Sequence, residues 1–96
     1  MKRVVIYCQQ QKNVEIIINE LIEYVKKQNW ELVTGVVENL NSSDGLFEII
    51  NMIHEVDAIL IYKKNITDEF NLQLLSELAR QEKIEIIDFI RTNKSK

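Results

Sequence analysis

The sequence predicts an α/β fold, with a four-stranded parallel sheet in the order 2-1-3-4 and helices on both faces as three layers. Short apolar runs rich in β-branched residues alternate with longer segments whose apolar residues recur at helical spacing. This alternation is typical of parallel sheets with helical crossovers. Right-handed crossovers leave few topologies for such a chain, and the chosen order places the first and third strands at the centre.

Four apolar runs predict the strands, at residues 3–8, 31–37, 58–62 and 84–89. The first and third runs are almost continuously apolar, as expected for inner parallel strands that are covered on both faces. Because the carboxyl ends of parallel strands meet at one edge, a functional cleft would be lined by 9–12, 39–44 and 63–68.

The first helix is predicted over 13–28, where the apolar residues form one stripe. Ile16 falls on the opposite side of this stripe, among Glu20, Glu23 and Lys27. The stripe consists of Val14, Ile17, Ile18, Leu21, Ile22 and Val25.

The second and third helices are predicted over 44–55 and 68–81. We expect Ser42 or Ser43 to cap the former, and Thr67 or Asp68 to cap the latter. Met52 lies off the second stripe, near Glu48 and Glu55. The two stripes consist of Leu46, Ile49, Ile50 and Ile53, and of Leu74, Leu75, Leu78 and Ala79.

Length and composition indicate one domain over residues 1–96, with a polar tail at about 91–96, because the chain has no proline and only two glycines to mark a linker. The net charge of −3 disfavours duplex DNA as a partner. One cysteine excludes an internal disulfide.

The apolar run near the amino end is short for a signal peptide, and no run approaches the ~18 apolar residues of a membrane span. We therefore expect a cytoplasmic protein with no membrane contact.

The strand-end loops offer little chemistry. The stretch "QQQKN" at 9–13 has no glycine to cradle a phosphate. His54 borders the second stripe and is interpreted as a packing residue, and Cys8 as a small core residue. Glu38 and Asp44 are interpreted as a solvated face. One cysteine and one histidine cannot build a metal site of ordinary spacing, so no metal or cofactor is expected.

Four stretches, in order, resemble a known family. They are "RVVIYC" at 3–8, "YVKKQNWELV" at 24–33, "DGLFEIINMI" at 44–53 and "VDAILIYKKN" at 56–65. Together they resemble the N-terminal catalytic domain of serine recombinases, the resolvase and invertase family, over about residues 3–89. The family's corresponding motifs are an "IYxRVS" strand, a "GWE" turn, an "RPGL"-like helix start and "DxxxVxxLDRLSR". The resemblance implies a resolvase-like version of the flavodoxin-like, three-layer fold.

The resemblance also implies that the family's catalytic groups are absent. The nucleophilic serine falls on Gln11, and the arginine two residues before it falls on Gln9. The aspartate of "LDRLSR" falls on Asn65. Without the serine and the arginines that offset charge on the DNA phosphate, strand cleavage by this mechanism is not expected. The family's catalytic positions are thus occupied by Gln9, Gln11, Ser43, Asn65, Ile66 and Glu69.

Two functions follow as expectations. The first is a non-enzymatic, serine-recombinase-like pseudoenzyme of phage or mobile-element origin. It would act in regulation or protein–protein interaction, with a protein partner or as a homodimer, through a helix face bearing Ile16 or Met52. The alternative is a small flavodoxin-like enzyme or nucleotide or ligand binder whose cleft includes Gln9, Gln11 and Asn65.

Overall fold

The computed structural model describes residues 1–89, and within them the predicted fold class and strand order are confirmed. All strand pairs are parallel, in the order β2-β1-β3-β4. The strands are β1 (Arg3–Gln9), β2 (Glu31–Glu38), β3 (Ala58–Ile61) and β4 (Glu85–Asp88). The helices are α1 (Val14–Lys27), α2 (Asp44–Asn51) and α3 (Glu69–Glu82), with 3₁₀ turns at Ile53–Glu55 and Lys63–Asn65.

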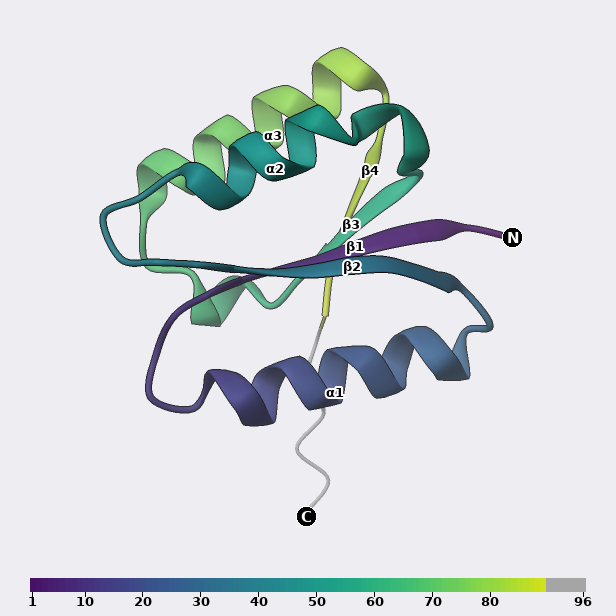
Figure 1. Cartoon of the computed structure of the whole chain (residues 1–96), viewed down its shortest axis with the longest axis horizontal. Helices are drawn as coiled ribbons and strands as arrows, with labels where there is room; N and C mark the ends of the chain where they lie inside the picture. The colour runs from purple at the N-terminus through teal and green to yellow at the C-terminus, as the bar shows by residue number, and fades with distance from the viewer. Residues whose placement is uncertain (90–96) are drawn as a thin grey trace.

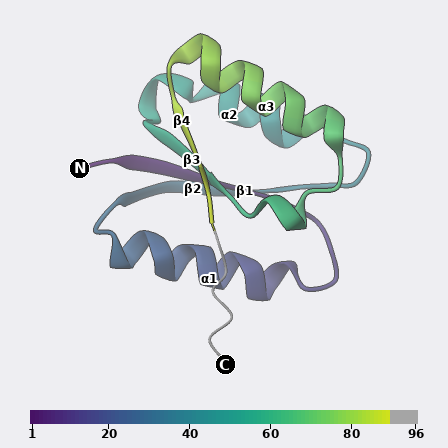
Figure 2. The same cartoon turned by 180° about the vertical axis from the view of Figure 1, so that it is seen from behind.

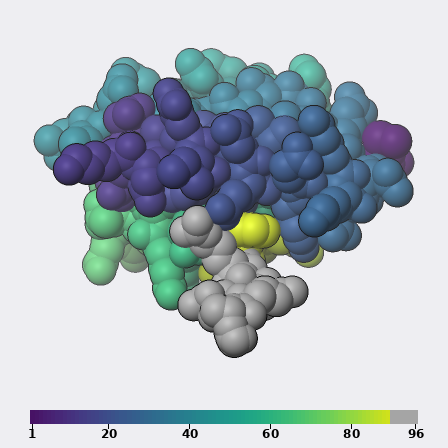
Figure 3. All heavy atoms as spheres, turned by 90° about the horizontal axis from the view of Figure 1, so that it is seen from below, coloured from purple at the N-terminus to yellow at the C-terminus, as the bar shows by residue number. Residues whose placement is uncertain are grey.

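The helices divide unequally between the two faces of the sheet. Figure 1 shows α1 below the sheet and both α2 and α3 above it, and the reverse view in Figure 2 shows the same division. In Figure 3, which looks at the lower face, α1 stretches across the molecule. One helix therefore covers one face, while two neighbouring helices share the other.

Alternation along β1 explains why this strand is apolar throughout. Successive side chains of a strand point to opposite faces. Val5 and Tyr7 enter the cluster under α2 and α3, whereas Val4, Ile6 and Cys8 enter the cluster over α1. An inner strand that serves two cores needs no polar face, as predicted for this strand.

The predicted stripe of α1 is confirmed. Leu21 is fully buried, and Ile18 and Ile22 pack at the edge of the same cluster, while Ile16 on the other side is 58% exposed. The helix ends at Lys27, and Asn29, two residues later, has a left-handed φ of 60°. The Trp30 N–H then donates to the Val25 carbonyl at 3.1 Å, which closes a Schellman-type end.

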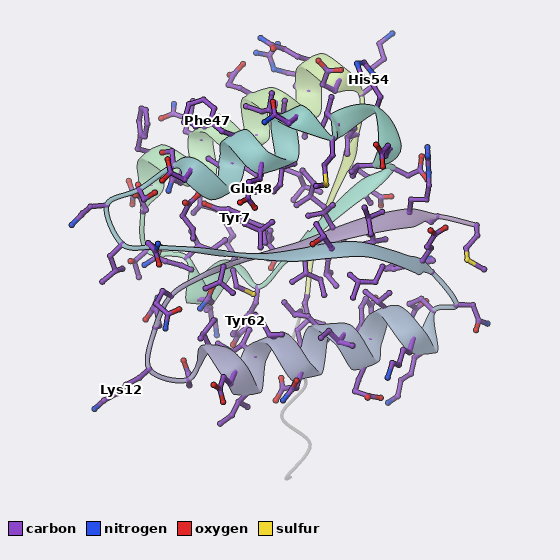
Figure 4. The ribbon with its side chains drawn as sticks, in the orientation of Figure 1. Tyr7, Lys12, Phe47, Glu48, His54 and Tyr62 are labelled. Atoms are coloured by element: carbon purple, nitrogen blue, oxygen red, sulfur yellow. The ribbon has the colours of Figure 1, made fainter. Side chains whose placement is uncertain are left out.

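The second helix is shorter than predicted, and two expectations about its end are wrong. The α-helix stops at Asn51, and the chain tightens into the 3₁₀ turn Ile53–Glu55. Met52 is half-buried against the cluster under α2 and α3, because the helical wheel no longer applies past Asn51. His54 is exposed and points away from the sheet (Figure 4), so it is not a packing residue.

The buried stripes of α2 and α3 are also narrower than predicted. Ile50 is 43% exposed and Leu74 is 39% exposed, although both were expected to face the core. Two helices share one face of the sheet, so each buries only its central row; Leu46 and Ile49 carry it on α2, and Leu75 on α3. The predicted cap of α3 is confirmed, since the Asp68 carboxylate accepts the Asn71 N–H at 3.1 Å.

Gly45 is required by a close approach between α2 and β2. A Cβ at this position would lie 2.6 Å from Val36 Cγ1 and 3.0 Å from Glu38 Oε1. We expect Gly45→Ala to lower the free energy of unfolding by roughly 1–3 kcal/mol, the usual range for overpacking a core. Gly35→Ala is the control, because a Cβ there meets nothing within 4 Å. Urea unfolding measures both, and equal stabilities would contradict the close approach.

Candidate functional site

The ends of β1, β2 and β3 meet at one edge of the sheet, where the cleft was predicted. Gln9 ends β1, Glu38 ends β2, and Asn65 closes the turn after β3. In Figure 4, Lys12 in the next loop points away from the molecule. The sequence therefore locates the meeting place correctly, and the side-chain contacts decide what it can do.

Gln9, Gln11 and Asn65 lie together, and both glutamines hydrogen-bond to Asn65. The Gln9 N–H donates to Asn65 Oδ1 at 2.7 Å, and Asn65 Nδ2 donates back to the Gln9 carbonyl at 3.1 Å. Gln11 Nε2 donates to the Asn65 carbonyl. Gln9 and Asn65 are only 4% and 3% exposed. The side chain of Asn65 thus hydrogen-bonds to the backbone of β1 at Gln9, as a neighbouring strand would, and its polar atoms are occupied there.

The Gln9 side chain fastens the loop before α3. Its Oε1 accepts the N–H groups of Thr67 and Asp68, at 2.9 and 3.1 Å, and its Nε2 donates to Thr67 Oγ1 at 2.8 Å. Each polar atom of this amide is therefore engaged. In the described part of the chain, no buried side-chain nitrogen or oxygen lacks a partner. We call Gln9, Gln11 and Asn65 the amide cluster. It is closed in the sense that the side-chain amides of Gln9 and Asn65 bond to neighbouring protein groups.

The other positions that the resemblance relates to catalysis are Ser43, Ile66 and Glu69. Ser43 Oγ donates to Asn71 Oδ1 at 2.6 Å, and Asn71 Nδ2 donates to the Ser42 carbonyl at 2.8 Å, so Asn71 ties α3 to the loop before α2. Ile66 is buried in the core, and Glu69 is exposed at the start of α3. None of these three positions supplies a positive charge.

The arginines of residues 1–89 lie elsewhere. Arg3 pairs with Asp57 at the opposite end of the sheet, and Arg80 pairs with Glu77 on α3. The hydrogen bond between the exposed side chains of Arg3 and Asp57 raises the pKa of Arg3 and lowers the pKa of Asp57. Neither guanidinium is available to offset charge at the strand ends.

Glu38 was interpreted as solvated, and this is wrong. It is 1% exposed, and Oε1 accepts the Tyr7 hydroxyl at 2.9 Å. The N–H groups of Gly45 and Leu46 donate to the same carboxylate at 2.8 and 3.2 Å. Glu38 therefore caps the start of α2, where a negative charge also suits the helix dipole. One sequence signal existed: Glu38 lies two residues after buried Val36 and so shares its face.

The cap assigned to a serine is consequently made by the Glu38 carboxylate. Ser43 holds the N-cap position without a side-chain capping bond, while Ser42 Oγ accepts only the Asp44 N–H, at 3.1 Å. A short polar residue before a helix is the ordinary capping signal. Here a strand end beneath the helix supplies the acceptor, which local sequence does not reveal.

Tyr7 points from β1 toward α2 (Figure 4). Burial, followed by the hydrogen bond to Glu38, raises the pKa of its phenol. A raised folded-state pKa means that this group stabilises the fold fully below the unfolded value of about 10 and stops doing so as pH rises above it. The protonated phenol is therefore a structural donor to Glu38.

We expect the free energy of unfolding to fall as pH rises above about 10, with a shallower fall in Tyr7→Phe, which has no phenol to ionise. At neutral pH the same variant is less stable by about 1 kcal/mol, because Glu38 loses a donor. Urea unfolding at a series of pH values tests this. Identical pH slopes for the two proteins would contradict it.

Cys8 is confirmed as a core residue. It is fully buried on the α1 side of β1, and burial raises the pKa of its thiol to about 12. At neutral pH the sulfur is a thiol rather than the thiolate that nucleophilic attack requires.

A pocket of ≈ 420 Å³ opens beside the amide cluster, and all three loops predicted to line the cleft contribute to it. Its charged lining residues are Asp68 and Glu69, both acidic, so a phosphate would be repelled. Within residues 1–89 no group of three or more His, Cys, Asp or Glu side chains could hold a metal ion. The lining consists of Gln9, Asn39, Leu40, Asn41, Thr67, Asp68, Glu69 and Asn71.

Comparisons with known proteins support the fold. A scan of family models and a search of curated proteins give no match. Among solved structures, the crystal structure of the N-terminal catalytic domain of TP901-1 integrase is similar, with a TM-score of 0.74 and 20% identity over 91% of this chain and 76% of that chain. The fold is resolvase-like. A likeness at this identity establishes the shared fold, and it supports the serine recombinase domain fold expected from the sequence.

The resolvase-like fold places the amide cluster at the carboxyl ends of the strands, where open α/β sheets bind ligands. Sequence reasoning located Gln9, Gln11 and Asn65 there and placed Thr67 in a loop that lines the cleft. It missed Asn71, which ties α3 to the loop before α2. As for membranes, no helix among the described residues is long and apolar enough to span a bilayer.

Proposed function

We propose that this chain is a serine-recombinase-like pseudoenzyme, which lacks strand cleavage and acts as a protein-interaction or regulatory module. The observation that supports this most directly is the closed amide cluster. Gln9, Gln11 and Asn65 stand where the resemblance places arginine, the nucleophilic serine and aspartate, and they bond to one another. Phosphoryl transfer needs cations at the developing charge, whereas this pocket is lined by Asp68 and Glu69.

The setting proposed for the protein is the cytoplasm of a host that carries a phage or other mobile element. That origin rests on the likeness to an integrase domain. A single cysteine, buried and unpaired in the described part, suits a reducing compartment. A net charge of −3 argues against duplex DNA as the main partner.

We expect no covalent protein–DNA adduct from this chain on a suicide recombination substrate, with or without Mg²⁺, because Gln11 cannot act as a nucleophile. A denaturing gel measures the adduct, with an active serine recombinase as the positive control. Duplex DNA should also bind more weakly than the roughly 10⁻⁴–10⁻⁶ M of non-specific binders. An adduct band would overturn the proposal.

Ile16 and Met52 are the contact residues suggested by the sequence. Ile16 is 58% exposed on the outer side of α1, and we propose it as a residue that contacts the partner. Met52 packs against the core and offers a partner less surface. Ile16→Glu therefore tests the α1 face, and an unchanged partner interaction would remove that face from consideration.

A second candidate, the small flavodoxin-like enzyme or ligand binder, is favoured by the pocket of ≈ 420 Å³ at the strand ends. Its amide and carboxylate lining suits a small polar ligand or a cation better than a nucleotide phosphate. A thermal-shift panel of nucleotides and divalent metals tests it, since a ligand that binds only the folded state raises the unfolding temperature. A shift that disappears in Gln9→Ala would favour this second function.

A further inference from the structure

Two neighbouring helices carry apolar side chains that the core does not use. Phe47 and Ile50 on α2 are 60% and 43% exposed, and Phe70 and Leu74 on α3 are 65% and 39% exposed. Each pair has the spacing, three or four residues, that places side chains on one side of a helix. We call these four residues the α2–α3 patch.

The two pairs face the seam between the helices. On α2, Gly45 abuts Val36 and Glu38 of β2, which turns Phe47 and Ile50 to the side away from β2, toward α3. Figures 1 and 2 show α2 and α3 side by side, and Figure 4 shows Phe47 pointing away from the sheet.

On α3, the opposite side faces β4. Leu72 and Ser76 line a groove with Ile86 of β4, so Phe70 and Leu74 lie on the flank toward α2. The four side chains therefore form one apolar surface along the seam. Aromatic and aliphatic anchors gathered in this way are typical of the centre of a protein interface.

The two helices that carry the patch have more acidic than basic residues. α2 carries no basic residue, and the arginine of α3, Arg80, is paired with Glu77. A two-fold contact between copies would set this patch against itself and bring like charges together. The acidic residues of the two helices are Asp44, Glu48, Glu69, Glu77 and Glu82.

We propose that the α2–α3 patch binds an amphipathic helix of another protein whose apolar side is flanked by Lys and Arg. This inference rests on the proposed function, that the chain acts by binding a protein, and it names the surface and the class of partner. Two adjacent helices form a seam into which a third helix can lay its apolar face. The excess of acidic residues on the two helices favours a basic partner over a second copy.

The test uses a displayed library of short helical peptides, selected against the full chain. We expect enriched peptides to carry apolar residues at helical spacing with Lys or Arg beside them. The double variant Phe47→Ser/Phe70→Ser should weaken their binding by roughly tenfold or more, the loss typical of removing interface anchors. Val37→Ser is the control, since Val37 is an exposed apolar residue of β2. Its neighbour Val36 enters the cluster under α2 and α3, so Val37 points to the opposite face of the sheet.

Several outcomes would overturn the inference. They are no enrichment, enrichment of acidic peptides, or equal binding to the wild type and the double variant. Circular dichroism of the variants checks folding, which substitution of exposed side chains should leave intact. Sedimentation velocity tests a second copy as the occupant, and a wild-type dimer that the double variant lacks would also overturn it. A DNA adduct would defeat the proposed function separately, whatever the peptides do.

Discussion

Leu21→Ala is expected to lower the free energy of unfolding by roughly 2–5 kcal/mol, the range for deleting a buried leucine side chain. Leu21 is fully buried at the centre of α1, in the cluster between that helix and the sheet. Among residues 1–89, α1 is the one helix on this face of the sheet, so no other helix of that part can close the cavity. A loss of this size is a large share of the 5–15 kcal/mol or so that stabilises a typical domain.

Ile16→Ala is the matched control, because it removes an aliphatic side chain from the same helix at an exposed position. Its effect on unfolding should stay within about 0.5 kcal/mol. Chemical unfolding of the isolated chain measures both variants. Comparable losses would mean that the outer side of α1 is covered in solution, for example by a second copy.

Glu38→Ala is expected to cost about 3 kcal/mol or more. The substitution leaves the Tyr7 hydroxyl and the N–H groups of Gly45 and Leu46 without their acceptor. Each buried group left unsatisfied costs about 1–3 kcal/mol. The negative charge at the start of α2 is lost as well.

Glu38→Gln separates charge from hydrogen bonding and should be less destabilising, because one carbonyl acceptor is retained. Glu31→Ala is the control for β2, since Glu31 begins the same strand and is exposed. Urea unfolding gives the order, with alanine at 38 the least stable. A Glu38→Ala protein as stable as Glu31→Ala would show that water replaces the carboxylate without loss.

The sequence predicts most of the fold because its signals are local. The stripe of α1 and the apolar runs of β1 and β3 follow from periodicity, and right-handed crossovers then fix the order of strands. The errors occur where a neighbouring element decides. Leu74 and Ile50 are exposed because α2 and α3 divide one face of the sheet between them, and a single helical wheel cannot show that division.

The candidate site was predictable as a location but not as a set of contacts. Parallel strands bring the loops after β1 and β3 together, so Gln9 and Asn65 were placed at one edge from sequence. Their pairing depends on atoms from residues 56 positions apart. Glu38 was misplaced because a carboxylate is rarely buried, and its donors come from a different strand and from a helix start.

The topology of the sheet also has a consequence for synthesis on the ribosome. β1 is the first strand to be made, and it pairs with both β2 and β3. Each later strand therefore emerges to find its partner already present, and β4 completes the sheet on β3. Until β3 emerges, however, one edge of the apolar β1 stays open. During that interval, in which α1, β2 and α2 are translated, the nascent chain is exposed to pairing with other chains.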